Sequence, residues 1–242
     1  MEYLTPFLIY PNDIIEGGMK ISLSQPNTTI KRQATQAFFD KTEAKPREEG
    51  VDFSLALIMA GVPGAGKTEY ISSFIEENEI FKHNALRIDL DEIITIFEEY
   101  QPEEDSRFRS IGNRIVENIL DRAFRNGYNF ILDGTFAGTK AINNVRRAVR
   151  HGYLVYIVVL VEGIEQAKEY TRIRREKTKR EIKNEAFDKT VIGIRKNLKI
   201  IQSEFVEKGL PVVVEFIEKR WQEGTVRYER RVWPNIDDLY EK

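Results

Sequence analysis

The residues with the clearest chemical meaning are positions 61–68, which read GVPGAGKT. They match the phosphate-binding pattern G-x-x-x-x-G-K-[ST] at every fixed position. Glycines let successive main-chain N–H groups approach phosphate oxygens, and the positive end of a following helix adds to the attraction. Lys67 would reach the β- and γ-phosphates, and the Thr68 hydroxyl would complete a Mg²⁺ shell. The residues expected to bind a nucleoside triphosphate are Gly61, Val62, Pro63, Gly64, Ala65, Gly66, Lys67 and Thr68. The alternative, a glycine-rich turn that binds nothing, fits a complete match less well.

A first acidic motif, RIDLDE, occupies residues 87–92. Asp89 and Asp91 are two residues apart, so an extended backbone would place both on one face. A carboxylate there can accept the proton of a substrate hydroxyl during phosphoryl transfer, or hold Mg²⁺ through water. We therefore expect Asp89 and Asp91 to contact the substrate. The alternative is that Asp89 only caps a helix that starts near Leu90.

A second acidic motif ends another apolar run, with Asp133, Gly134 and Thr135 in sequence. An acid at the end of a buried strand occupies the position in which P-loop proteins place a Mg²⁺-binding carboxylate. Asp133 could bind Mg²⁺ or a substrate hydroxyl, and Thr135 could donate a hydrogen bond. The alternative is an ordinary strand-to-loop turn, for which aspartate and glycine are typical residues.

A basic run, YTRIRREKTKR, covers residues 170–180. On a helix Arg172, Arg175 and Arg180 fall within a common arc, whereas Arg174 points elsewhere. Phosphoryl transfer spreads negative charge over the γ-phosphate, which a fixed guanidinium stabilises, and a lid would exclude water. For this run alone, a solvated basic helix face is the interpretation that the pattern favours.

The elements that must position these residues alternate along the chain. Short apolar runs predict strands at 54–60, 86–89, 129–133, 153–161 and 211–217, with helices between them. This order indicates βαβ crossovers and an α/β fold with a doubly wound, mainly parallel sheet flanked by helices. Ligands of such sheets gather at the carboxyl ends of the strands, where the motifs above fall. Residues 225–233 alternate well enough for a further strand, hairpinned to 211–217.

Residues 1–50 differ in composition, with four prolines and a Gly17-Gly18 pair. We expect an N-terminal extension containing a helix from Thr28 or Thr29 to about Lys41 and a linker at 45–50. Residues 51–242 would form the main domain, with an arginine-bearing lid helix at about 163–186. Within this domain, Glu117 lies close to the apolar stripe of an amphipathic helix. From the pattern alone, a glutamate on the protein surface is the simpler interpretation.

Composition excludes several classes of protein. The chain has 242 residues, no cysteine and two histidines, which excludes disulfides and thiolate metal sites and leaves little for a histidine metal centre. Charged residues are 31% of the chain but almost cancel, at net −2, so a dedicated nucleic-acid surface is not expected. No run approaches the length of a membrane span, and no secretory signal is evident, so we expect a cytoplasmic protein.

The ordered set of motifs resembles the zeta toxins of bacterial toxin–antitoxin systems and zeta-like P-loop kinases. The resemblance runs from about Leu55 to Trp221 and rests on GVPGAGKT, RIDLDE, GNRIVENILDRAFRNGYNFILDGT and the basic run that ends at Arg180. It implies a P-loop kinase fold and transfer of the ATP γ-phosphate, with Mg²⁺, to the 3′-hydroxyl of the amino-sugar in UDP-N-acetylglucosamine. It also implies an antitoxin as a possible protein partner.

The resemblance assigns roles to residues at matching motif positions. Lys67 and Thr68 would act in the phosphate loop, and Asp91 would activate the acceptor hydroxyl. The positions that would contact the substrate are Glu117, Asp133 and Thr135. Arg180, with one or more of Arg172, Arg174 and Arg175, would stabilise the transferring phosphoryl group.

Three features depart from the family pattern. The family commonly has Glu where Asp133 stands, and an arginine often found after the Gly-Thr pair is replaced by the run Phe136-Ala137-Gly138. Both changes lie on the acceptor side. The extension at 1–50 is unlike the short segment that precedes the first strand in the typical toxin. One interpretation is that residues 1–50 contain a built-in regulator.

Two other functions remain alternatives on sequence grounds. One is a P-loop kinase with another acceptor, such as a polynucleotide 5′-end or an antibiotic hydroxyl, although the near-neutral charge counts modestly against nucleic acid. The other is a nucleotide-dependent binding switch. No N-K-x-D guanine-reading run is present, and no clear water-positioning glutamine follows the acids.

Overall fold

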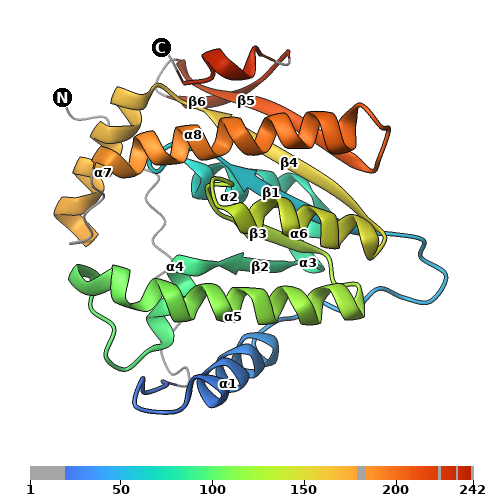
Figure 1. Ribbon diagram of the computed structural model, residues 1–242, viewed down its shortest axis with the longest axis vertical. Coiled ribbons are helices and arrows are strands. Elements are labelled where there is room, and N and C mark those ends of the chain that lie inside the picture. The colour runs from blue at the N-terminus through green and yellow to red at the C-terminus, as the bar shows by residue number, and fades with distance from the viewer. Residues whose placement is uncertain (1–19, 179–183, 223–224, 233, 241–242) are drawn as a thin grey trace.

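The computed structural model describes residues 20–178, 184–222, 225–232 and 234–240 and contains one six-stranded sheet. Its order is β2-β3-β1-β4-β5-β6 (Figure 1). The first five strands in this order pair in parallel, and β6 is antiparallel to β5. The strands are β1 (Ser54–Ala60), β2 (Leu86–Asp89), β3 (Phe130–Asp133), β4 (Tyr153–Val161), β5 (Val212–Gln222) and β6 (Thr225–Arg231). The expected α/β fold with a mainly parallel, doubly wound sheet is therefore confirmed.

Helices cover both faces of this sheet. The helices are α1 (Asn27–Asp40), α2 (Lys67–Glu77), α3 (Glu79–His83), α4 (Leu90–Ile93), α5 (Asp105–Asn126), α6 (Thr139–Arg150), α7 (Ile164–Thr178) and α8 (Asn184–Ile201). In Figure 1, α5, α6 and α8 lie in front of the sheet, and α2 lies behind it. Right-handed crossovers require this division, because the step from β1 to β2 runs opposite to the later steps across the sheet.

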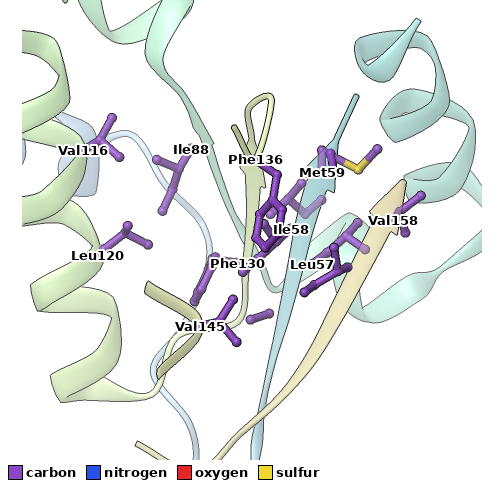
Figure 2. Close-up of a cluster of buried hydrophobic side chains, with 14 of the residues drawn as sticks. Leu57, Ile58, Met59, Ile88, Val116, Leu120, Phe130, Phe136, Val145 and Val158 are labelled. Carbon is purple, nitrogen blue, oxygen red and sulfur yellow. The ribbon is translucent and has the colours of Figure 1, made fainter. Parts of the chain in front are cut away.

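The core fills the space between the sheet and its helices. β1 is buried at six of its seven positions, as expected for a central parallel strand. Figure 2 shows Ile58 of β1 on the same side of the sheet as Phe130 of β3, with Val116 and Leu120 reaching in from α5, whereas Leu57 lies on the other side of β1. The central strands therefore need no polar face and can present their carboxyl ends rigidly.

The chain before β1 packs on the outside of α5. Helix α1 lies along α5 (Figure 1), with the guanidinium of Arg122 4.1 Å from the ring centre of Phe39. Ahead of α1, Ile21 bridges Phe97, and Glu99 accepts hydrogen bonds from Ser22 Oγ at 2.6 Å and from the next main-chain N–H. Residues 20–23 thus hold the segment that follows α4.

The end of the described chain anchors the other side of the sheet. Tyr240 is buried, and its hydroxyl donates to the carbonyl oxygen of Leu160 at 2.9 Å. Arg195 of α8 donates to the carbonyl oxygen of Leu239. These contacts lie beside the end of β4, from which α7 departs.

Several predicted boundaries can be compared with the described elements. The lid helix expected at about 163–186 corresponds to α7, which ends at Thr178, and α8 begins at Asn184. Arg180 and residues 223–224, which connect the two strands of the expected hairpin in the sequence, lie outside the described residues. The hairpin partner expected at 225–233 is present as β6, which ends at Arg231. The division of the chain at residue 50 stays a prediction. None of the helices in the described ranges is long and apolar enough to span a membrane.

Candidate active site

The phosphate-binding loop lies between β1 and α2, where the sequence predicted it. Gly64 and Gly66 adopt left-handed backbone conformations, with φ of +79° and +85°. Gly66 is the residue before α2, so no side chain covers the first turn of that helix from this position. The N–H groups of that turn and of the loop can then converge on an anion.

Lys67 is enclosed by its own loop. Its ammonium donates to the carbonyl oxygens of Gly61 at 3.1 Å and Val62 at 3.0 Å. Burial is the largest influence on Lys67 and lowers its pKa, while the negative charges of Asp133 and Asp91 act in the opposite direction. The lysine therefore stands between the loop and a group of carboxylates.

Two carboxylates, those of Asp89 and Asp133, lie at the ends of neighbouring strands. Asp89 of β2 and Asp133 of β3 are direct partners in the parallel register. Burial, followed by the charges of Asp133 and Asp91, raises the pKa of Asp89 to about 8. Burial also raises the pKa of Asp133, against the opposing charges of Lys67 and Arg87. Two partly buried carboxyl groups side by side disfavour each other's ionisation, so this edge of the sheet favours a cation.

Thr68 and Asp133 meet at this edge. The Thr68 hydroxyl lies 3.4 Å from Asp133 Oδ2. Mg²⁺ in nucleotide sites is usually held by one or two protein oxygens together with water and phosphate oxygens. A hydroxyl and a carboxylate at this separation fit that requirement. Within the described ranges, no group of three or more His, Cys, Asp or Glu residues could hold a metal by itself.

Asp91 occupies the first turn of α4, not an extended strand. Helix α4 starts at Leu90, and Asp89 caps it by accepting the Asp91 N–H at 2.8 Å. The expectation that an extended backbone places both acids on one face is therefore wrong, and the capping role considered for Asp89 is present. The helical turn directs Asp91 to Arg109 of α5, which donates from Nη2 to Asp91 Oδ1 at 2.8 Å.

The loop after β3 is held from two sides. The carbonyl oxygen of Thr135 accepts the N–H of Gly61, which ties this loop to the phosphate-binding loop at 3.3 Å. Phe136 has a φ of +61° and is buried in the core, as Figure 2 shows. The buried amide of Asn197, on α8, donates to the carbonyl oxygens of Phe136 at 2.7 Å and Gly138 at 3.0 Å.

Glu117 lies on α5, where it is bonded to residues of α6. Its carboxylate accepts from Asn144 Nδ2 at 3.2 Å and from Arg147 Nη1 at 2.9 Å, with Lys140 Nζ 3.9 Å away. Asn144 is buried. Glu117 is thus part of a polar contact between two helices.

Helix α7 lies directly against the phosphate-binding loop. A Cβ atom at Gly64 would come closer than 3.0 Å to the carbonyl oxygen of Ala167 and to 3.0 Å from Thr171 Cγ2. Ala167 is fully buried in this contact. The basic run therefore begins on a helix that touches the loop.

The three arginines in the described part of α7, Arg172, Arg174 and Arg175, are all exposed. Arg172 forms ion pairs with Glu169 and Glu176 on its own helix, and 61% of its side chain is exposed. Besides burial, the positive charge of Arg174 lowers the pKa of Lys67, so Arg174 lies close enough to act on the loop. The sequence analysis placed Arg172 and Arg175 in a common arc and Arg174 elsewhere, and which of these arginines reaches the site stays a prediction.

Sequence reasoning missed Arg109. It forms an i,i+4 pair with Asp105 at the start of α5, with Nε 2.7 Å from Asp105 Oδ2. That spacing is the only local signal, and it is typical of an ordinary surface ion pair. Contact with Asp91, 18 residues away, depends on how α4 and α5 pack.

Two of three comparisons with known proteins found matches to this chain. A family model described as zeta toxin matches residues 40–232. None of the curated proteins matches the sequence. Among solved structures, the chain is similar to the PezAT chromosomal toxin–antitoxin system of Streptococcus pneumoniae. The TM-score is 0.62 at 19% identity, covering 80% of this chain and 78% of that chain.

Two structures of AvrRxo1-ORF1:AvrRxo1-ORF2 are also similar. The structure with ATP has a TM-score of 0.59 at 12% identity, covering 84% of this chain and 64% of that chain. The native complex has a TM-score of 0.59 at 11% identity, covering 89% of this chain and 70% of that chain. At these identities the structural likeness establishes the fold.

Proposed function

The chain belongs to the zeta toxin family, and from this premise we propose that it is an ATP-dependent kinase that phosphorylates a hydroxyl of a nucleotide sugar. UDP-N-acetylglucosamine is the leading acceptor. The observation that carries the proposal is the placement of Lys67, enclosed by its loop, near the carboxylates that end β3 and begin α4. A binding switch needs the loop, but only a kinase needs a carboxylate to receive the proton of an acceptor.

In this proposal the loop residues bind the phosphate groups, and a second pair of residues binds a metal ion. The N–H groups around Gly64 and Gly66 would hold the β-phosphate, and Lys67 would leave its loop carbonyls for phosphate oxygens. Thr68 and Asp133 would hold Mg²⁺, which neutralises charge on the β- and γ-phosphates when it is bound.

Asp91 is the proposed base. It would take the proton of the acceptor hydroxyl as that oxygen bonds to the γ-phosphorus and the bond to the ADP oxygen breaks. Its position in the first turn of α4 places it on the same edge of the sheet as Asp89 and Asp133. Asp89 supports this arrangement by capping α4, and its proposed contact with the substrate is secondary to that role.

The acceptor would lie on the side of β2, β3 and α5. Asp133, Thr135 and Glu117 are the proposed contacts, by their match to the family motifs. Glu117 is already oriented by Asn144 and Arg147, so its carboxylate can accept from a sugar hydroxyl without first being ordered.

The transferring phosphoryl group would be stabilised from α7. We assign this role first to Arg174, whose charge acts on Lys67. The exposed Arg172 would need its ion pairs with Glu169 and Glu176 to break before it could contribute. Arg175 and Arg180 stay in the proposal as lid arginines.

A protein partner is part of the proposal. One structurally similar protein is part of a toxin–antitoxin system, and another is an ORF1:ORF2 complex. We therefore propose that an antitoxin binds this chain.

Incubation with γ-labelled ATP, Mg²⁺ and a panel of nucleotide sugars, oligonucleotides and aminoglycosides tests the function. We expect label on a nucleotide sugar. Asp91→Asn should bind ATP like the wild type and lose roughly 10²–10⁴ in turnover. Asp188→Asn, which removes an exposed carboxylate on α8, is the matched control and should keep full turnover. Release of inorganic phosphate with no labelled acceptor would refute the kinase, and full transfer by Asp91→Asn would refute the base.

A further inference from the structure

Arg109 connects the proposed base to the start of α5. Its Nη2 donates to Asp91 Oδ1 at 2.8 Å, and its Nε donates to Asp105 Oδ2 at 2.7 Å. About a third of each of the Arg109 and Asp91 side chains is exposed, whereas Asp105 is buried. One guanidinium therefore joins a partly exposed carboxylate on α4 to a buried one on α5.

From this geometry we infer that Arg109 is a positioning residue that holds the Asp91 carboxylate in the orientation needed to receive the acceptor proton. The inference rests on the proposed function. Asp105 fixes the position of Arg109 from the same helix, and Arg109 in turn fixes Asp91.

The charges around Arg109 are suited to this role. Burial disfavours its positive charge, but the two carboxylates outweigh burial and raise the pKa of Arg109. The side chain is thus permanently charged and held between two anions. A planar guanidinium can serve both carboxylates through donors on different atoms at fixed angles, whereas a lysine has one flexible ammonium.

The need for such a support follows from the shape of α4. This helix is four residues long and continues into a short 3₁₀ segment, Ile94–Ile96. A helix this short depends on its neighbours for its position. The 22-residue α5 is the rigid neighbour to which Arg109 attaches Asp91.

The competing interpretation is that Arg109 only stabilises the start of α5 through Asp105. Both interpretations predict a loss of activity when Arg109 is changed, so a single variant cannot separate them. The two interpretations differ in whether the loss of activity depends on an intact Asp91. A residue that acts through Asp91 has nothing left to position once Asp91 can no longer accept a proton.

The test is a double-mutant cycle with Arg109→Lys and Asp91→Asn, measured as kcat and KM with labelled ATP and the acceptor found in the panel. Arg109→Lys alone should lower kcat by about 10²-fold, as for a reacting group displaced by roughly 1 Å, with KM for ATP unchanged. In the Asp91→Asn background the same change should lower kcat no further.

The matched control is Arg107→Lys. Arg107 lies in the same turn of α5 and pairs with Glu104 at 2.9 Å, and both side chains are more than half exposed. This variant should keep the wild-type kcat. If Arg109→Lys does not unfold cooperatively, Asp105→Asn replaces it in the cycle with the same expected outcome.

Two results would overturn the inference. One is an equal loss from Arg109→Lys in the wild-type and the Asp91→Asn backgrounds, and the other is no loss at all. Absence of transfer by the wild-type protein would refute the proposed function instead. A crystal structure of Arg109→Lys would then decide the inference by itself. An Asp91 carboxylate turned away from its wild-type position supports it, and an unmoved carboxylate overturns it.

Discussion

Substitution of Gly64 by alanine tests the closest contact between the phosphate-binding loop and α7. Gly64 has a φ of +79°, and a Cβ there would lie closer than 3.0 Å to the carbonyl oxygen of Ala167. That oxygen belongs to a helix backbone and cannot rotate away. A separation of ~3.3 Å between this Cβ and the carbonyl oxygen of Ala167 would require either α7 or the loop to move by up to about 1 Å.

The cost of the Gly64→Ala change has two parts. A left-handed backbone costs an alanine about 1–2 kcal/mol, and the displaced helix adds the loss of packing around Ala167. Gly50→Ala isolates the first part, because Gly50 has a φ of +88° but its Cβ would meet nothing within 4 Å. For a chain of this length, each kcal/mol lowers Tm by roughly 2–4 °C.

Thermal unfolding and labelled-phosphate transfer should be measured for both variants. We expect Gly64→Ala to have a lower Tm than Gly50→Ala and to lose about 10²-fold in kcat, because a shift of roughly 1 Å misplaces the reacting groups. Gly50→Ala should keep the wild-type kcat. Equal Tm values for the two variants would show that α7 does not rest on the loop in solution, and the reasoning from the contact would fail.

Three further predictions follow from the site. Lys67→Met should abolish transfer of labelled phosphate, because the ammonium that would reach the phosphate oxygens is lost while an apolar side chain fills its place; transfer at the wild-type rate would contradict this. Arg174→Ala should lower kcat, whereas Arg172→Ala should leave it unchanged; the opposite order in steady-state assays would assign the phosphoryl contact to Arg172 instead. Asn197→Ala should lower the free energy of unfolding by about 1–3 kcal/mol, because the buried carbonyl group of Phe136 loses its donor. Urea titration measures this loss, and a change below about 1 kcal/mol would mean that the loop finds other partners.

The parts of the site that could be predicted from the sequence depend on local pattern. GVPGAGKT follows an apolar run and precedes a helix, and the motif requires left-handed glycines that the structure contains at Gly64 and Gly66. The acids of β2 and β3 were predicted at strand ends, and the register places Asp89 beside Asp133. Local residue order determines these features, because each acid is the last residue of the strand that carries it.

The remaining features depend on packing between distant elements. Asp91 was assigned an extended backbone because period-2 spacing cannot show that Asp89 caps a helix starting one residue later. The arc of α7 was predicted without knowing which side of the helix faces the loop, and Ala167 defines that side. Arg109 shows only an i,i+4 pair in the sequence, because its contact with Asp91 requires the packing of α4 on α5.

The loop after β3 explains how the chain can lack the arginine common in the family. Its replacement region begins with Phe136, whose side chain is buried in the core and whose backbone is held at a positive φ by Asn197. A residue in this conformation cannot extend a long side chain toward an acceptor. The loop therefore presents Thr135 and main-chain groups, while its position is set from α8. The helix that follows this loop, α6, does not supply the missing cation from its first turn, because Arg147, which contacts Glu117, lies in its last turn. Arg147 also pairs with Asp121 and lies over the Phe124 ring, so its charge is satisfied within the contact between α5 and α6.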